Sequence, residues 1–217
     1  FNLVSTSINI SDLTEVHLVL LGDTFNSEGE RSTTAKGTRQ DDALGWQEAF
    51  VLTRSFVADI TQDMLAVGVP HVTVHVISGN HDWERSWYLA DSLWGYYHAH
   101  TNVTVITDTI RHYINYGSTL IGLTHGDQLK PNDLPMLAVK EGGAEQHSHI
   151  YWHMGHWHTR KEEEVQGVVC KWFGTPSGVG EYDDRKGFVL NAKECVGVVF
   201  DAFLGEIAML REKVNHG

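Results

Sequence analysis

The chain has 217 residues, 41% of them hydrophobic, and a formal net charge of −12. We predict a single domain over residues 1–217, because this length suits one sizeable core. The negative charge argues against a broad nucleic-acid-binding surface, which needs clustered Lys and Arg. It does not exclude a nuclease, because bound divalent cations would bring positive charge to the phosphate. No apolar run approaches the ~20 residues of a membrane span, so we expect a cytoplasmic protein without membrane contacts.

The hydrophobic pattern predicts an alternating α/β chain. An apolar run at 16–21 ends at Gly22-Asp23 and is typical of a strand buried on both faces. Residues 24–42 are polar and predict a long loop, and helical spacing predicts helices at 43–67 and 82–97. Further strands are predicted at 72–77, 103–106, 110–116, 119–124 and 150–154, and as an antiparallel C-terminal series at 165–172, 187–190, 197–203 and 206–210.

Three tryptophans, Trp83, Trp87 and Trp94, share one face of the second predicted helix. Such residues could stack on nucleic-acid bases. Their helical spacing favours packing in the core, and we expect them there. The two cysteines, Cys170 and Cys195, do not form a disulfide framework, and we expect both to be buried, reduced thiols.

Four short fragments with metal-ligating side chains occur where predicted strands end. Asp, Asn and His are ligands of borderline and hard divalent metals. Because the carboxyl ends of strands in α/β sheets form sites, the four could meet in space. The fragments, in chain order, are Gly22-Asp23, Gly79-Asn80-His81-Asp82, Thr124-His125-Gly126-Asp127 and Gly155-His156-Trp157-His158.

Taken singly, these residues have simpler interpretations. Asp23 alone reads as a surface acid and Asn80 as a turn residue, and His125 alone fits a ligand and a capping residue equally well. His156 and His158 alone could be a surface pair. The joint occurrence of all the fragments in this order favours a metal-dependent phosphoesterase.

In these fragments the chain resembles the calcineurin-like metallophosphoesterase superfamily. The family pattern is Asp-x-His, Gly-Asp, Gly-Asn-His-Asp or Gly-Asn-His-Glu, then His, then Gly-His-x-His. The resemblance implies a four-layer αββα sandwich of two mixed sheets flanked by helices. It implies two divalent metal ions, with Mn the expected ion and Fe, Zn or Ni also fitting. A hydroxide bridging the two ions would attack the phosphoester.

The resemblance also implies a role for each matched residue. Asp23 corresponds to the carboxylate that bridges two metals, Asn80, His125 and His156 to the other ligands of one metal, and His158 to a ligand of the second. His81 corresponds to a catalytic histidine that protonates the leaving oxygen, as suits an imidazole that titrates near neutral pH. Asp82 and Asp127 either orient neighbouring imidazoles or are solvated or capping residues.

One motif of the family pattern has no counterpart. Asp12-Leu13-Thr14 is a degenerate match to Asp-x-His, but only ten residues separate Asp12 from Asp23. A parallel crossover needs about a dozen or more. We therefore expect the first strand to be missing and the domain to be N-terminally incomplete. The competing interpretation is a natural one-metal or inactive variant, acting as a non-catalytic, metal-stabilised interaction module.

The long loop 24–42, followed by Trp46 and Phe50, is similar to the phage-type branch related to DNA-repair exonucleases. Arg31, Lys36 and Arg39 in this loop either contact substrate phosphates or are simply solvated. We therefore expect a nucleic-acid phosphodiester as substrate. The alternative is a small phosphodiester or phosphomonoester, such as a cyclic nucleotide.

Overall fold

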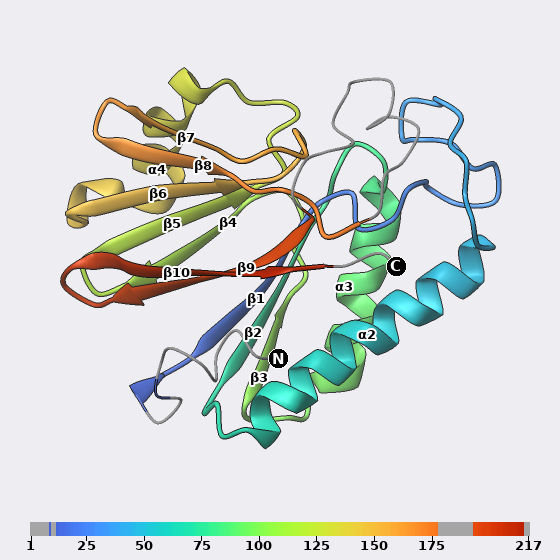
Figure 1. Cartoon of the computed structure of the whole chain (residues 1–217), viewed down its shortest axis with the longest axis horizontal. Helices are drawn as coiled ribbons and strands as arrows, with labels where there is room; N and C mark the ends of the chain where they lie inside the picture. Colours follow the sequence, from blue (N-terminus) through green and yellow to red (C-terminus); the bar gives the residue numbers. More distant parts are fainter. Residues whose placement is uncertain (1–8, 10–11, 178–192, 215–217) are drawn as a thin grey trace. The chain divides into compact units, whose positions relative to one another are not determined.

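The computed structural model describes residue 9 and residues 12–177 and 193–214. Contacts divide the chain into two compact units, one running to His112 and the other starting at Tyr113. Both units combine helices with sheets (Figure 1). The predicted α/β fold of sheets flanked by helices is therefore confirmed. Among the described residues, no helix is long and apolar enough to cross a membrane.

A parallel sheet in the order β1-β2-β3 forms the centre of the first unit. Long helical connections join its strands, as parallel pairing requires. The elements are β1 (Val16–Leu21), α2 (Trp46–Ala66), β2 (Val72–Ile77), α3 (Trp83–Tyr97) and β3 (Val103–Ile106).

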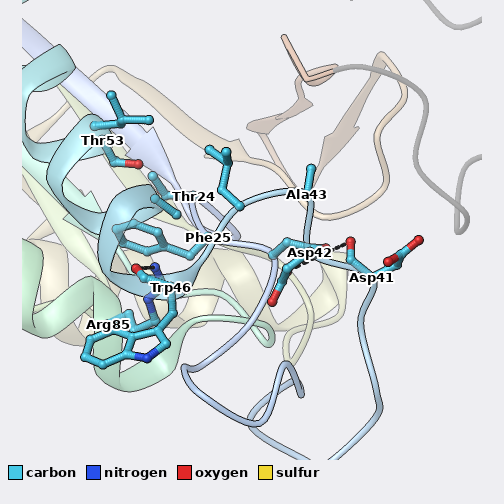
Figure 2. A pocket seen from close by; sticks show the side chains of 12 residues that line it. Thr24, Phe25, Asp41, Asp42, Ala43, Trp46, Thr53 and Arg85 are labelled. Carbon is cyan, nitrogen blue, oxygen red and sulfur yellow. Dashed lines mark hydrogen bonds between the residues drawn. The ribbon is translucent and has the colours of Figure 1, made fainter.

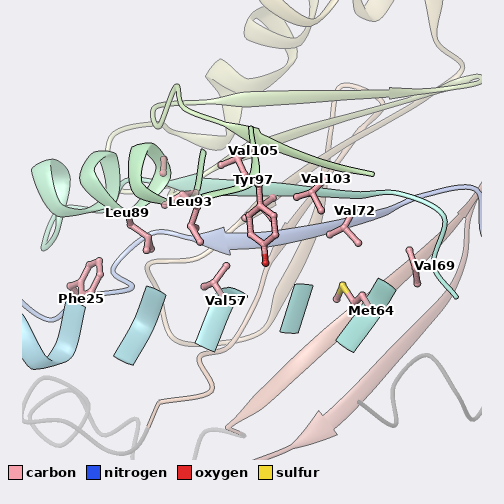
Figure 3. Close-up of a cluster of buried hydrophobic side chains, with 13 residues drawn as sticks. Phe25, Val57, Met64, Val69, Val72, Leu89, Leu93, Tyr97, Val103 and Val105 are labelled. Atoms are coloured by element: carbon pink, nitrogen blue, oxygen red, sulfur yellow. The ribbon is translucent and has the colours of Figure 1, made fainter. Parts of the chain in front are cut away.

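One face of this sheet and both helices share a single apolar core (Figure 3). Val72, Val74 and Val76 of β2 are fully buried and alternate along the strand. Leu93 of α3 and Val57 of α2 pack in the same cluster. Burying a side chain of this size contributes about 1.5–3 kcal/mol, so the core fixes where β1 and β2 end.

A mixed sheet in the order β4-β5-β6-β8-β7 forms the second unit, together with a separate β9–β10 hairpin. β5, β6 and β8 are parallel, and β7 is antiparallel to β8. A second core gathers around the fully buried Trp152. The elements are β4 (His112–Tyr116), β5 (Thr119–Thr124), α4 (Leu134–Gly142), β6 (His149–Met154), β7 (Lys161–Val165), β8 (Val168–Trp172), β9 (Glu194–Asp201) and β10 (Gly205–Lys213).

Several details differ from the sequence-based expectations. β1 is half-buried along its whole length and not buried on both faces, because within its sheet it pairs only with β2. The stretch 165–172 is not one strand: Val165 ends β7 and Val168 begins β8, because Gln166 and Gly167 both have positive φ and turn the chain. Helix α4 was not predicted. The strand expected at 187–190 lies outside the described residues.

The tryptophan prediction is wrong. Trp83, Trp87 and Trp94 are 41%, 47% and 50% exposed. They do share a face of α3, but the buried face is the neighbouring one, with Leu89 and Leu93. Of the two free cysteines, Cys170 is buried as expected and Cys195 is exposed.

Candidate functional site

Each unit carries a pair of candidate ligands at one edge of its sheet. Asp23 follows β1 and Asn80 follows β2, and these strands are parallel. His125 follows β5 and His156 follows β6, which are parallel as well. Because parallel strands end at the same edge, the fold brings each pair together. The expected placement at strand ends thus holds within each unit.

Asp82 holds the two loops of the first unit together. Its Oδ1 accepts a hydrogen bond from the Gly79 N–H at 2.8 Å, and its Oδ2 accepts one from the Phe25 N–H at 3.0 Å. Burial raises the pKa of this carboxyl, against the opposing effect of both hydrogen bonds. Asp82 therefore neither orients an imidazole nor lies in solvent. It connects the segment after β1 to the segment after β2.

Asp23 lies against the segment that contains Asn80. The Asp23 Oδ1 accepts a hydrogen bond from the His81 N–H at 2.9 Å. A Cβ at position 79 would lie 2.0 Å from the same oxygen, so the approach requires glycine. The Asn80 carbonyl accepts a hydrogen bond from the Ala35 N–H at 3.2 Å. These contacts place the Asp23 carboxylate next to the Asn80 backbone.

The His81 ring has one nitrogen engaged. Its Nδ1 lies 2.9 Å from the carbonyl oxygen of Asn26. A carbonyl only accepts, so Nδ1 carries a proton and donates it. In the neutral ring Nε2 is then the nitrogen left to take up and release a proton. The ring is half-buried, so it remains accessible to a ligand.

The second unit brings two imidazoles into contact. His156 Nδ1 lies 3.2 Å from His125 Nε2. His125 is only 2% exposed, and its carbonyl accepts a hydrogen bond from the Gly155 N–H at 3.1 Å. His158 follows two residues later and is half-buried. Two ring nitrogens at this separation suit either a shared proton or a shared cation.

Backbone strain is concentrated on the candidate ligands. Among the residues that the structure describes, five non-glycine residues have positive φ. Three of them are Asp23, His156 and His158, with φ of 50°, 67° and 49°. An L-residue in this conformation costs about 1–3 kcal/mol and persists where the surroundings impose it, often at functional sites. The strain is evidence for a site that does not depend on the sequence motifs.

A cavity of about 340 Å³ opens beside the segment that follows Asp23 (Figure 2). Its lining joins apolar and aromatic side chains to two carboxylates and a guanidinium. The lining residues are Thr24, Phe25, Asn26, Asp41, Asp42, Ala43, Leu44, Trp46, Ala49, Leu52, Thr53 and Arg85.

Arg85 supports the wall of this cavity. Its Nη1 donates to the Ser27 carbonyl at 2.7 Å and its Nη2 to the Trp46 carbonyl at 3.0 Å, and its guanidinium lies 4.0 Å over the Phe25 ring. The sequence reasoning missed Arg85. A signal existed, because its spacing from Leu89 places it on the buried face of α3.

Asp42 is the second residue of the wall that the sequence reasoning missed. Burial raises the pKa of this carboxyl, but hydrogen bonds from Ser27 and Asn26 outweigh burial and lower it overall. The Ser27 hydroxyl donates at 2.6 Å and the Asn26 amide at 2.9 Å. Nothing in the sequence distinguishes Asp42 from the other acidic residues of this polar loop. By contrast, three basic residues of the same loop are exposed: Arg31, Lys36 and Arg39.

No protein-family model and no curated protein matches the chain. Among solved structures, it is similar to a conserved uncharacterized protein from Streptococcus pneumoniae described as a predicted phosphoesterase, with 13% identity, a TM-score of 0.39, and 92% of this chain and 96% of that chain covered. It is also similar to Vps29 from Entamoeba histolytica complexed with zinc, with 13% identity, a TM-score of 0.37, and 93% and 98% covered.

A third similar structure is Yfce, a phosphoesterase from E. coli, with 13% identity, a TM-score of 0.33, and 72% of this chain and 93% of that chain covered. All three TM-scores lie below 0.5, so these likenesses carry no conclusion about what this chain does. The residues themselves carry the proposal that follows.

Proposed function

We propose that this chain is a metal-dependent phosphoesterase. The observation that carries the proposal is the strained backbone at Asp23, His156 and His158, the same residues that the sequence pattern selects as ligands. The donor set of carboxylate, amide oxygen and imidazole fits Mn, Fe, Zn or Ni, with Mn the first ion to test. The close approach of the His125 and His156 nitrogens at 3.2 Å fits a shared cation.

In this proposal Asp23, Asn80, His125 and His156 are the ligands of one metal. A second metal would take Asp23 and His158. A bound divalent cation would withdraw charge from the phosphate oxygens and favour attack at phosphorus. Asp82 would help to position Asp23 and Asn80, because its carboxylate accepts backbone hydrogen bonds from both of the segments that carry them.

His81 acts as the proton donor to the leaving oxygen in this proposal. The Asn26 carbonyl fixes the ring with Nδ1–H donating, so Nε2 is the atom that would deliver the proton. His81→Ala should therefore keep the metal and lose turnover by about 10²–10⁴-fold. Asn80→Ala and His125→Ala should instead weaken metal binding. Calorimetric titration with MnCl₂, after removal of metal by chelator, measures metal binding in all three variants. Equal loss of metal in the three contradicts the assignment of His81.

The substrate is proposed to be a phosphodiester. The resemblance of the 24–42 loop to the DNA-repair branch makes nucleic acid the first candidate. Two observations favour a small substrate as the second: the net charge of −12 and the limited volume, about 340 Å³, of the cavity next to the segment after Asp23. An organic group of a small phosphodiester would contact the Trp46 side of that cavity, where flat apolar surface is available.

One paired assay separates these substrates. Turnover of bis-p-nitrophenyl phosphate, single-stranded DNA and double-stranded DNA is measured with Mn²⁺. Trp46→Ala should raise KM for the small ester while a control, Trp94→Ala on α3, leaves it unchanged. Turnover of DNA alone supports the nuclease. A chain that binds metal and hydrolyses none of the three would be the non-catalytic interaction module.

A further inference from the structure

Three imidazoles form a hydrogen-bonded row in the first unit. The core with α2 and α3 takes Val16, Leu18 and Leu20 of β1, so His17 belongs to the opposite face. His17 Nδ1 lies 2.8 Å from His75 Nε2 on β2. His75 Nδ1 lies 2.8 Å from His112 Nδ1. We call His17, His75 and His112 the histidine ladder.

A backbone carbonyl fixes the direction of every hydrogen bond in the ladder. His112 Nε2 is bonded to the carbonyl oxygen of Asp108, which only accepts, so Nε2 carries the proton. The Nδ1 of neutral His112 is then bare and must accept from His75 Nδ1–H. His75 Nε2 is bare in turn and accepts from His17 Nδ1–H. The neutral ladder therefore ends at a bare His17 Nε2.

This free end lies beside a carboxylate. His17 Nε2 is buried and has no hydrogen-bond partner, and the nearest acidic oxygen is Glu15 Oε1 at 3.4 Å. When His17 Nε2 carries no proton, its lone pair faces the negative charge of the Glu15 carboxylate. The ladder thus has four proton positions and, when neutral, three protons. A fourth proton completes it and breaks no bond. A fifth would set two N–H groups against each other.

The groups around the ladder decide where its charge rests. Burial lowers the pKa of His17, Glu15 raises it, and His71, which directly precedes β2, lowers it. Burial also lowers the pKa of His112, opposed by Asp108, and that of His75 to about 3. His17 is the most exposed of the three and the one beside Glu15, so the positive charge is best placed there.

The far end of the ladder is tied to the candidate site. The Thr109 carbonyl accepts a hydrogen bond from the Ser78 N–H at 2.7 Å, and Ser78 directly precedes Gly79-Asn80. Asp108 and His112 flank Thr109 in the same segment. Loss of the bond between His75 and His112 would therefore loosen the segment that holds the end of β2.

We propose that the histidine ladder is a pH switch that takes up one proton intact and opens when it takes up the next. The fourth proton enters at His17 Nε2, forms a charge-assisted hydrogen bond to Glu15 and leaves the ladder whole. The fifth proton breaks a bond between two imidazoles and releases residues 108–112 from the end of β2. Every residue of the ladder belongs to the first unit.

Long-range ¹H–¹⁵N NMR of the histidine rings tests the proposal in the unmodified protein. At pH 8 we expect neutral His17 and His75 to carry their proton on Nδ1 and His112 on Nε2. On acidification His17 should titrate first. Neutral His75 with its proton on Nε2, or His75 titrating before His17, would overturn the proposal.

A variant pair tests the counter-ion, and hydrogen exchange tests the release. Glu15→Gln should lower the pKa of His17 by a few tenths of a unit, as for other part-exposed ion pairs, whereas Glu30→Gln, at an exposed loop position, should not. The Ser78 amide should stay protected while His17 titrates and lose protection, by tenfold or more, when His75 does. An unchanged His17 in Glu15→Gln, or loss of Ser78 protection with the His17 titration, contradicts the switch.

Discussion

Strain at His156 offers a direct measure of what the site costs the fold. The residue has φ of 67°, a conformation that disfavours any side chain with a Cβ by about 1–2 kcal/mol. In chelator, His156→Gly should therefore be more stable than His156→Ala by about that amount, although both lack the imidazole. Urea unfolding of the two variants measures the difference.

The control for this pair is His147, where φ is −121°. There the glycine variant should be the less stable of the two, since glycine loses more backbone entropy on folding. Equal stability of the two His156 variants would mean that the backbone at this position carries no strain. Both His156 variants should also lose metal, whereas both His147 variants should keep it.

Gly79 gives a second test at the residue scale. An added Cβ would meet Asp23 Oδ1 at 2.0 Å and the Asp23 backbone N at 2.3 Å, so Gly79→Ala must displace Asp23. We expect a stability loss of about 1–3 kcal/mol, as for other overpacked positions, and weaker metal binding. Urea unfolding and calorimetric titration measure the two effects.

Gly95 on the exposed side of α3 is the matched control, because nothing lies within 4 Å of its Cβ position. Gly95→Ala should stabilise the protein by about 0.5–1 kcal/mol, since alanine is the better helix former. A Gly79→Ala variant that behaves like Gly95→Ala would show that Asp23 does not need this close approach.

The site illustrates what residue patterns can and cannot predict. Each candidate ligand follows a strand whose apolar run is evident in the sequence, so its place at the sheet edge was predictable. The contacts of Asp82 with Phe25, and of His81 with Asn26, join residues 57 and 55 positions apart. Such contacts depend on how two loops fold over each other, which no local pattern encodes.

At the scale of elements, apolar runs with abrupt ends were predicted with the right bounds. β1, β2, β3 and β5 begin and end where the sequence indicated. α4 was missed because it is short and opens with Leu134-Pro135, a dipeptide that also fits a loop. The tryptophans of α3 misled because periodicity identifies a shared face but not which face is covered. Which face of a helix is buried depends on the elements that pack against it.

His153 on β6 gives a pH-dependent prediction. Burial, and secondarily Lys171, lowers its pKa to about 3. The folded pKa lies below the unfolded value of 6.5, so stability is present above pH 6.5 and is lost as the pH falls from 6.5 towards 3. When the pH falls from 7 to 5, the burial of this histidine should lower the free energy of unfolding by about 2 kcal/mol.

His153→Gln and His153→Leu should both remove that part of the acid sensitivity. His153→Leu should also gain stability at pH 7, because it removes a buried Nε2 that has no hydrogen-bond partner. Urea unfolding at the two pH values provides the measurement. Met154→Leu, in the same strand, should shift stability equally at both pH values. Variants of His153 as acid-sensitive as the parent would rule out the burial effect.

For the whole molecule, the proposed ligand set predicts unequal metal sites. One metal has four candidate donors, whereas the second has Asp23 and His158. We expect calorimetry with Mn²⁺ to find one tight and one weak site, and His158→Ala to remove only the weak one. Two sites of equal affinity would mean that further donors, outside the residues identified here, complete the second site.

The proposed metal also predicts how the two units respond to it. If Asp23 and Asn80 share an ion with His125 and His156, a free metal concentration of 100 times the Kd should stabilise both units by about 2.7 kcal/mol. Hydrogen exchange at β2 and β5 amides, with and without Mn²⁺, reads the two units separately. Asn80→Ala and His125→Ala should each abolish the gain in both units, and His98→Ala, on the exposed end of α3, should abolish neither. A gain confined to one unit would mean that the donors of that unit bind the metal alone, because an ion that takes no ligand from the other unit cannot stabilise it.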